Sequence, residues 1–294
     1  MKKIQRKFAL GSEWIYVKIY TGYKTADHLL VNDLYSLTHS LTKKNLIRKF
    51  FFIRFSDPFY HIRLRLHVTD VSNIGIIISS LHKALHPKIE NRLITKLQFD
   101  TYNRETERYH DLLIEKAETV FCTDSSYIMK IIRNVVANEA EDNRWLAGIL
   151  LITSFLDCSK ISMEEKFRLM EGLAKSFKNE FGFDMYNSKQ FNVKYREHTQ
   201  VINDVISRTY LSNGFEKIYP LIDKRNKELK PIMEDIKAIS EKYNLDYIRY
   251  LSSYLHMTIN RLFPVKNRLH ELLLYDMTSR YYKSLLARKK FDSQ

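Results

Sequence analysis

The 294-residue sequence is poor in the residues that form loops and crosslinks. It contains 7 glycines, 5 prolines and 2 cysteines, Cys122 and Cys158. So few glycines and prolines leave little material for linkers or low-complexity segments, and we detect no internal repeat. The cysteines do not form a C-x-x-C pair, and a chain of this length does not depend on one disulfide. We therefore expect two reduced thiols in the core.

Long apolar runs and several common catalytic motifs are also missing. No stretch approaches the roughly 20 apolar residues that a membrane helix needs, and residues 1–10 lack a signal-peptide core. We therefore expect a cytoplasmic protein without a membrane span. The sequence has no P-loop, no G-x-G-x-x-G after a strand, no H-E-x-x-H, no G-x-S-x-G and no cysteine cluster. These absences argue against nucleotide, nicotinamide, zinc-protease and serine-hydrolase functions, and they indicate no cofactor and no metal.

What the sequence has in excess is positive charge. It contains 48 Lys and Arg against 34 Asp and Glu, a formal net charge of +14. This charge favours anionic partners, which could be nucleic acid, an acidic peptide or a carboxylate-bearing small group. A lysine-rich genome would give the same count without a functional cause. With 45% hydrophobic residues, the chain has enough apolar material for one large domain or two fused sub-domains.

The first hundred residues alternate between strand and helix patterns. Period-two apolar alternation and β-branched or aromatic residues predict strands over 14–20, 50–55, 60–68 and 93–102. Helical spacing predicts helices over 26–41 and 72–85. The order is β-α-β-β-α-β, which predicts a ferredoxin-like antiparallel sheet with two helices on one face.

Beyond residue 106 the strand patterns stop and helical periodicity continues to the C-terminus. The expected helices are 127–137, 144–156, 164–177, 200–210, 215–243, 247–263 and 268–287. Pro220 and Pro231 would break or kink the fifth of these. We therefore predict an α+β protein with a sheet-containing part over 1–105 and a C-terminal helical layer over 106–294. No linker separates the two parts, which favours a single domain over 1–294.

One predicted strand carries a row of cationic side chains. The alternation in 61–65 places His61, Arg63 and Arg65 on one face of the sheet. Buried cations need anionic partners, because unpaired buried charge is costly. Asp57 or other carboxylates of the protein could supply these partners. Otherwise the row is a docking site for a substrate carboxylate, which suits the planar guanidinium.

Two further segments contain groups that could move protons. Glu105 and Arg108 lie three residues apart where the fourth strand gives way to a helix, and could form an ordinary ion pair or act beside the cationic strand. The predicted helix over 247–263 carries His256, Asn260 and Arg261. Histidine titrates near neutral pH, although a lone helical histidine is more often a structural residue.

Taken together, these segments resemble the C-terminal domain of lantibiotic dehydratases, which also occurs alone as the thiopeptide-type bacteriocin biosynthesis proteins. The resemblance covers nearly the whole chain. It rests on the following segments: Trp14 to Tyr20, Phe52 to Pro58, His61 to Arg65, Tyr102 with Glu105, Arg108 and Tyr109, Ala117-Glu118, Phe121, Asp124-Ser125, His256-Met257, Asn260-Arg261 and Glu271. Each piece is short, but their order and spacing make the combination specific.

The resemblance implies a lyase. In that family, a partner domain uses glutamyl-tRNA to esterify Ser or Thr of a precursor peptide, and this domain eliminates glutamate to leave dehydroalanine or dehydrobutyrine. The family's catalytic residues align with five positions: Arg63, Arg65, Glu105, Arg108 and His256. We expect His256 or Glu105 to take the proton while the arginines hold the glutamyl carboxylate. We also assign four residues to substrate binding: Arg54, His61, Asn260 and Arg261.

The sequence departs from the family pattern at two places. Where the family often continues R-Y-G-G, this chain has Arg108-Tyr109-His110-Asp111, so the turn after the arginine must differ. Phe55 replaces a common tyrosine, which puts any role of that hydroxyl in doubt.

Other functions stay open at this point. A thiopeptide pyridine synthase resembles the same fold but performs a cycloaddition and releases the leader peptide. A non-catalytic subunit could instead bind a leader strand at the sheet edge. For elimination, the expected partners are a ribosomally made precursor peptide and a separate tRNA-dependent glutamylating protein, because 294 residues leave no room for a glutamylation domain. A homodimer is compatible with the sequence.

Overall fold

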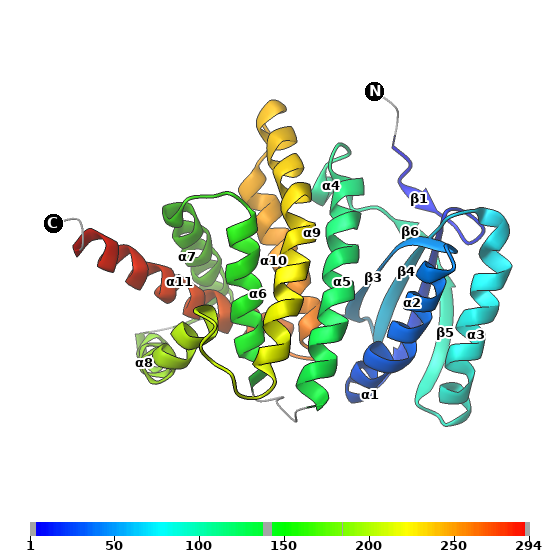
Figure 1. Cartoon of the computed structure of the whole chain (residues 1–294), viewed down its shortest axis with the longest axis horizontal. Helices are drawn as coiled ribbons and strands as arrows, with labels where there is room; N and C mark the ends of the chain where they lie inside the picture. The colour runs from blue at the N-terminus through cyan, green and yellow to red at the C-terminus, as the bar shows by residue number, and fades with distance from the viewer. Residues whose placement is uncertain (1–3, 138–142, 184, 292–294) are drawn as a thin grey trace. The chain divides into compact units, whose positions relative to one another are not determined.

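Two units, Met1–Arg133 and Asn134–Gln294, make up the chain in the computed structural model, shown in Figure 1. The structure describes residues 4–137, 143–183 and 185–291. The boundary between the units falls inside helix α5 (Ile114–Ala137), beyond the position at which the sheet-containing part was expected to end. That the units together form one functional domain stays a prediction.

Unit 1 is built on a four-stranded antiparallel sheet with the strand order β3-β4-β2-β5. The strands are β2 (Trp14–Thr21), β3 (Ile47–Ser56), β4 (Tyr60–Val68) and β5 (Ile94–Asp100). All four coincide with predicted strands. Two-residue strands β1 (Lys7–Phe8) and β6 (Tyr102–Asn103) pair with each other in a small second sheet that the sequence did not predict.

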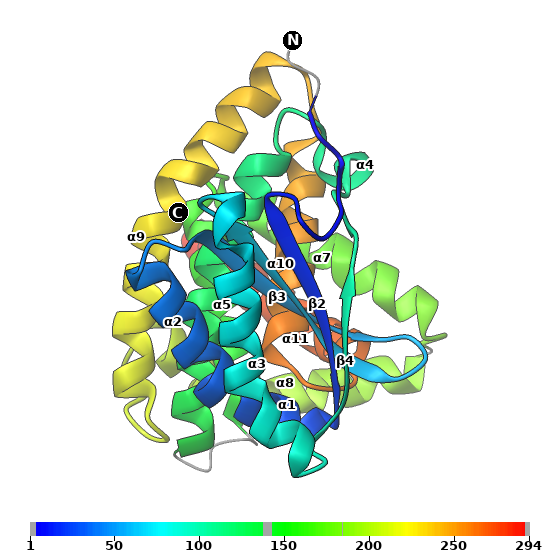
Figure 2. The same ribbon diagram turned by 90° about the vertical axis from the view of Figure 1, so that its right-hand side faces the viewer.

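Helices cover the apolar face of this sheet. They are α1 (Tyr23–His28), the π-helical segment η1 (Leu29–Leu34), α2 (Tyr35–Lys43), the 3-10 turn η2 (Val71–Asn73) and α3 (Ile74–Glu90). Figure 2 shows α2 and α3 on one side of the strands. Alternation along the strands puts Ile62, Leu64 and Leu66 on this face, where each is 0% exposed. The opposite face carries the cationic row.

Helix α5 covers the outer edge of β3 within unit 1. The Phe52 backbone N–H donates to the Ser125 hydroxyl at 3.2 Å, and the Phe51 and Phe121 rings are 5.4 Å apart. Pairing of an edge amide with a helix side chain keeps that edge from remaining open. The short helix α4 (Thr106–Tyr109) precedes α5.

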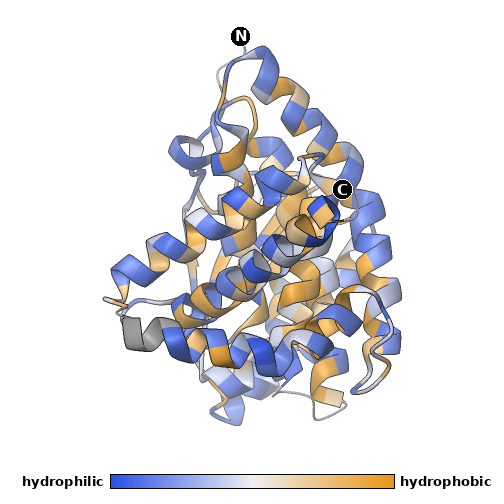
Figure 3. Ribbon diagram, turned by 90° about the vertical axis from the view of Figure 1, so that its left-hand side faces the viewer, coloured by the Kyte–Doolittle hydropathy of each residue, from blue (hydrophilic) through white to orange (hydrophobic). Residues whose placement is uncertain are grey.

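Unit 2 is helical throughout the part that the structure describes. Its helices are α6 (Arg144–Cys158), α7 (Met163–Glu180), α8 (Met185–Ile206), α9 (Phe215–Lys242), α10 (Tyr247–Leu262) and α11 (Asn267–Phe291). Figure 3 shows hydrophilic and hydrophobic residues alternating along these helices. α6 is almost fully buried, and a Cβ at Gly148 would lie 2.9 Å from Leu274 Cδ1, so a larger residue there would require the Leu274 side chain of α11 to move.

The predicted α+β architecture is confirmed, with local corrections. α9 continues through Pro220 and Pro231, so neither proline ends the helix. α8 begins fifteen residues before its predicted start at 200, because its first turns are too polar for apolar spacing to reveal them. Cys122 and Cys158 are free thiols, and only Cys158 is fully buried. Among the described residues, no helix combines the length and apolar character needed to cross a bilayer.

The environment of a half-buried histidine in unit 2 predicts that stability depends on pH. His270 stacks on Phe263 with ring centroids 3.8 Å apart, and burial, with Arg144 and Lys266 nearby, lowers its pKa from 6.5 to about 4. The unfolded chain therefore binds a proton near pH 6.5, whereas the folded chain binds it only near pH 4. As pH falls through this window, protons favour the unfolded state.

We predict that His270→Phe, which keeps the stacked ring, removes this dependence. Lowering the pH from 7 to 4.5 should reduce the unfolding free energy of unit 2 by about 2 kcal/mol more in the wild type than in the variant. Urea unfolding at both pH values measures the difference. If the unfolding free energy falls by the same amount in the two proteins, the pKa of His270 is not lowered in the folded state.

Candidate active site

Arg65 is the last residue of the cationic row and is enclosed by aromatic rings. Its guanidinium carbon lies 4.6 Å from the centroid of Tyr16, 5.0 Å from Tyr102 and 5.1 Å from Phe51. The residue is 7% exposed, and burial lowers its pKa. Its Nε has no hydrogen-bond partner, and no carboxylate in the described part of unit 1 forms an ion pair with it. The aromatic ring faces offset part of the cost of burying this charge.

Arg63 stands next to Arg65 on the same face and is held by two neighbours. Its guanidinium carbon lies 3.4 Å from the centroid of the Phe55 ring, and its Nε donates to His61 Nε2 at 3.1 Å. Directly opposite on β2, Lys18 forms an ion pair with Asp100 at 2.5 Å. Asp57, which the sequence offered as a partner for the row, forms no ion pair in the described part of unit 1. The row therefore keeps an excess of positive charge.

Arg54 does not join this group. It pairs across the hairpin with Ile62, whose side chain faces the helices, so Arg54 points to the opposite face of the sheet from Arg63. Its Nη2 forms an ion pair with Asp27 of α1 at 2.5 Å, and its Nη1 donates to the Tyr60 hydroxyl at 3.1 Å. This arrangement stabilises the interior of unit 1 and gives the predicted substrate contact of Arg54 no support.

Glu105 and Arg108 lie at the start of α4 as an exposed pair. Their side chains are 3.6 Å apart at the closest oxygen and nitrogen and are 59% and 43% exposed. After Arg108 the chain turns at His110 with φ 60° and ψ 148°, a conformation that favours glycine. The resemblance leads one to expect glycine at this position, and whether the turn differs from that of the family stays a prediction.

In unit 2, His256 is coupled to a buried carboxylate. Its Nδ1 lies 2.7 Å from Glu271 Oε1 of α11, and the Tyr275 hydroxyl donates to the same oxygen at 3.1 Å. The Glu271 side chain is 2% exposed, whereas that of His256 is 32% exposed. A carboxylate at Nδ1 selects the tautomer protonated there, which leaves the lone pair of Nε2 able to accept a proton.

The other two residues predicted on α10 differ in exposure. Asn260 is half-buried, one helical turn from His256, while Arg261 is 1% exposed. Arg261 therefore lies on the inner side of α10, and His256 and Asn260 on its outer side. Within unit 2, the structure brings His256 and Asn260 together on one face and separates Arg261 from them.

Sequence reasoning gave no role to several residues that shape these sites. Tyr16 and Tyr102 enclose Arg65 from strands β2 and β6, and Glu271 orients His256 from another helix. The alternation of β2 could have placed Tyr16 on the cationic face, because that strand was predicted. Glu271 was quoted in the resemblance without a role, and nothing in its local sequence indicates burial.

The similarity of this chain to known proteins extends over residues of both units. A family described as lantibiotic biosynthesis dehydratase, C-terminal, matches residues 14–282. The chain belongs to this lantibiotic dehydratase C-terminal family. The match spans all strands of the four-stranded sheet and both His256 and Glu271.

Full-length relatives are much longer than this chain. It is 25% identical over 263 residues to the subtilin biosynthesis protein SpaB of Bacillus subtilis, covering 89% of the chain and 25% of SpaB. It is 24% identical over 271 residues to the nisin biosynthesis protein NisB of Lactococcus lactis subsp. lactis, covering 90% and 25%. The chain thus spans about a quarter of the curated relatives it matches.

Solved structures share the fold of this lantibiotic dehydratase C-terminal chain. The tRNA-dependent lantibiotic dehydratase MibB from Microbispora sp. 107891 has a TM-score of 0.75 at 15% identity, over 97% of this chain and 29% of MibB. The pyridine synthase TbtD from thiomuracin biosynthesis has a TM-score of 0.66 at 11% identity, over 93% and 98%. TsrL has a TM-score of 0.64 at 10% identity, over 91% and 94%.

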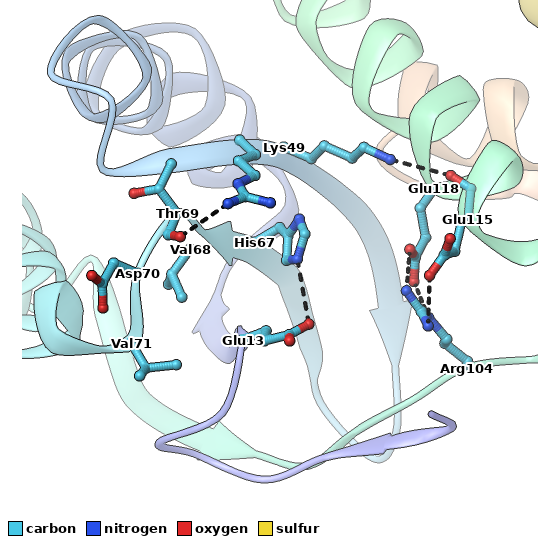
Figure 4. Close-up of a pocket in the computed structure, with 11 residues that line it drawn as sticks. Glu13, Lys49, His67, Val68, Thr69, Asp70, Val71, Arg104, Glu115 and Glu118 are labelled. Carbon is cyan, nitrogen blue, oxygen red and sulfur yellow. Dashed lines mark hydrogen bonds and ion pairs between the residues drawn. The ribbon is translucent and has the colours of Figure 1, made fainter. Parts of the chain in front are cut away.

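A separate polar pocket lies at the far end of the row in unit 1. It has a volume of about 590 Å³, and Figure 4 shows His67, Arg104 and Glu118 among its walls. Arg104 and Glu118 form a two-pronged ion pair, with Nε to Oε1 at 2.7 Å and Nη2 to Oε2 at 2.8 Å. The Tyr102 hydroxyl also donates to Glu118, which connects this pair to the rings around Arg65. No group of metal-binding side chains occurs in the described ranges.

We predict that this buried pair is structural and that its loss is costly. Glu118→Ala should lower the unfolding free energy of unit 1 by about 3 kcal/mol, because Arg104 stays buried without its closest counter-ion. Glu115, which lies 3.6 Å from Arg104 and is 66% exposed, provides the control. Glu115→Ala should cost less than about 0.5 kcal/mol. Similar urea midpoints for the two variants would contradict the assignment.

Proposed function

We propose that this chain is a cytoplasmic lyase that eliminates glutamate from glutamylated Ser or Thr residues of a ribosomally made precursor peptide. A separate tRNA-dependent protein would attach the glutamate. In the elimination, a base takes the α-proton, the electron pair forms the Cα–Cβ double bond, and the Cβ–O bond breaks to release glutamate. The reaction needs a base, cations for the developing enolate and a site for the leaving carboxylate.

The observation that carries this proposal is the environment of Arg65. A guanidinium held at 7% exposure without a carboxylate partner in unit 1 is unfavourable unless something else supplies negative charge. A substrate carboxylate or an enolate oxygen would supply it. Arg63 lies on the same face, and its terminal amino groups form no hydrogen bond within the described part of unit 1. The two arginines together suit a planar carboxylate.

The proposed base is His256, oriented by Glu271. Glu271 fixes the tautomer in which Nε2 accepts a proton, and its charge stabilises the imidazolium that results. Glu105 and Arg108 would then assist the leaving group or bind it, and Asn260 would contact the peptide. The proposal thus assigns proton removal to Nε2 of His256 and anion binding to the arginines of β4. We also infer that the strand order of unit 1 is of the ferredoxin-like kind.

A pyridine synthase is the second candidate. Its support is the extent of the structural match, which covers 98% of TbtD but only 29% of MibB. That reaction joins two dehydroalanines and releases the leader peptide, so it needs cations and a proton shuttle but no glutamyl site. The arginine pair of β4 favours elimination.

Product mass separates the two functions. The purified chain is incubated with a glutamylated precursor peptide, without tRNA and without added metal, and the product is analysed by mass spectrometry. We expect loss of glutamic acid and formation of dehydroamino acids. Release of a leader fragment with ring formation would replace the proposal with the synthase. An unchanged peptide would support a non-catalytic binding subunit.

Arg65 allows a test in which stability and activity move in opposite directions. Arg65→Met keeps the volume of the side chain and removes a buried charge that lacks a partner in unit 1, so Tm should stay equal or rise. Elimination should fall at least about 100-fold, because the cation no longer stabilises developing charge. Arg48→Met, at an exposed position of β3, is the control and should change neither quantity. An Arg65→Met variant that remains active would contradict the role of Arg65.

Glu271 provides an independent test of the base. Glu271→Gln keeps a hydrogen-bond acceptor near His256 but removes the negative charge, so kcat should fall about 100-fold while KM changes little. Glu180, an exposed partner of Arg268 on α7, gives a matched control, and Glu180→Gln should leave kcat unchanged. Equal kcat values for the two variants would show that His256 does not depend on this carboxylate.

A further inference from the structure

His61 is almost completely enclosed in unit 1, and both of its ring nitrogens are already in use. The residue is 1% exposed. Nδ1 lies 2.8 Å from the Phe59 carbonyl oxygen, and Nε2 lies 3.1 Å from Arg63 Nε. The Tyr20 ring packs against the imidazole at a tilt of 34° with centroids 4.6 Å apart, and the Phe55 ring is 5.8 Å away. No ring nitrogen remains for a substrate.

These two contacts determine the protonation state. A carbonyl oxygen only accepts, so Nδ1 must carry a hydrogen. Arg63 Nε only donates, because a guanidinium has no acceptor, so Nε2 must carry a lone pair. The imidazole is therefore neutral and protonated at Nδ1. A protonated imidazole would turn an N–H of Nε2 toward the N–H of Arg63 and lose this bond.

The surroundings of the ring favour the same state. Burial lowers the pKa of His61, the hydrogen bond to Phe59 opposes this change, and the positive charges of Arg63 and Lys18 lower the pKa further. Asp57 acts in the opposite direction. At neutral pH the ring is thus available as an acceptor.

We propose that His61 is a positioning residue: its neutral imidazole accepts from Arg63 Nε and turns the terminal amino groups of Arg63 toward an anionic substrate. This inference rests on the proposed function and replaces the substrate contact expected for His61 from the sequence. Phe55 stacks on one face of the guanidinium, so the ring and the imidazole together fix its plane. A guanidinium fixed in this way loses less conformational freedom when it binds a carboxylate.

Two substitutions separate positioning from simple packing. His61→Phe keeps a ring for Tyr20 to stack on but removes the acceptor. His61→Gln loses the ring but carries an amide oxygen that can accept from Arg63 and an amide N–H that can donate to Phe59. If His61 only fills space, Phe should be tolerated better than Gln. If His61 positions Arg63, Gln should be tolerated better than Phe.

Steady-state kinetics with the glutamylated peptide gives the first readout. We expect His61→Phe to raise KM about ten-fold with kcat within about two-fold, because uniform carboxylate binding is lost. His61→Gln should stay within about three-fold of the wild-type KM. In an Arg63→Met background, His61→Phe should change KM less than about two-fold, since the two residues act through one contact. An undiminished effect in that background would overturn the proposal.

Nitrogen NMR of the full chain gives a readout that does not require activity. In the wild type, the His61 ring should show a protonated Nδ1 and an unprotonated Nε2, and the Nε–H of Arg63 should exchange slowly with water. In His61→Phe that exchange should accelerate at least about ten-fold. If the wild type does not eliminate glutamate but these signals appear, the proposed function fails and the positioning contact stands. A protonated Nε2 or unchanged Arg63 exchange would overturn the positioning proposal itself.

Discussion

The cost of holding positive charge on a sheet face shapes unit 1. Arg65 is buried among three aromatic rings rather than beside a carboxylate, and its ring contacts lie between 4.6 and 5.1 Å. Ring faces attract a cation without neutralising it, whereas a protein carboxylate would form a closed ion pair. The site therefore remains able to bind an external anion. The hairpin β3–β4, the neighbouring strand β2 and the small strand β6 each contribute part of this enclosure.

His61 and His256 differ in chemistry because their hydrogen-bond partners differ. His61 contacts a carbonyl oxygen and an arginine, so both nitrogens are occupied and the ring is neutral. His256 contacts a carboxylate through Nδ1, so its other nitrogen can act as a base. The sequence and its family resemblance assigned His61 to substrate binding, but they could not show that protein groups already contact both of its ring nitrogens.

Most of the fold was predictable because its signals are local. Period-two alternation predicts β2 and β4, and it places Arg63 and Arg65 on the same face, as the strand register shows. Arg54 shows the limit of this reasoning. Its cross-strand neighbour Ile62 faces the helices, and its ion-pair partner Asp27 lies on another element. Glu271 is fifteen residues from His256 along the chain, and tertiary packing alone brings the two together.

Phe55 illustrates how the enclosure tolerates change. The resemblance leads one to expect tyrosine here, yet the Arg63 guanidinium lies 3.4 Å from the centroid of the Phe55 ring and contacts its face. Stacking depends on the ring and not on a hydroxyl group at its edge, so phenylalanine preserves the contact. The orientation of Arg63 then depends on His61, which supplies the hydrogen-bond acceptor that a phenylalanine cannot. In this chain the ring face of Phe55 and Nε2 of His61 are therefore the two groups that hold the Arg63 guanidinium.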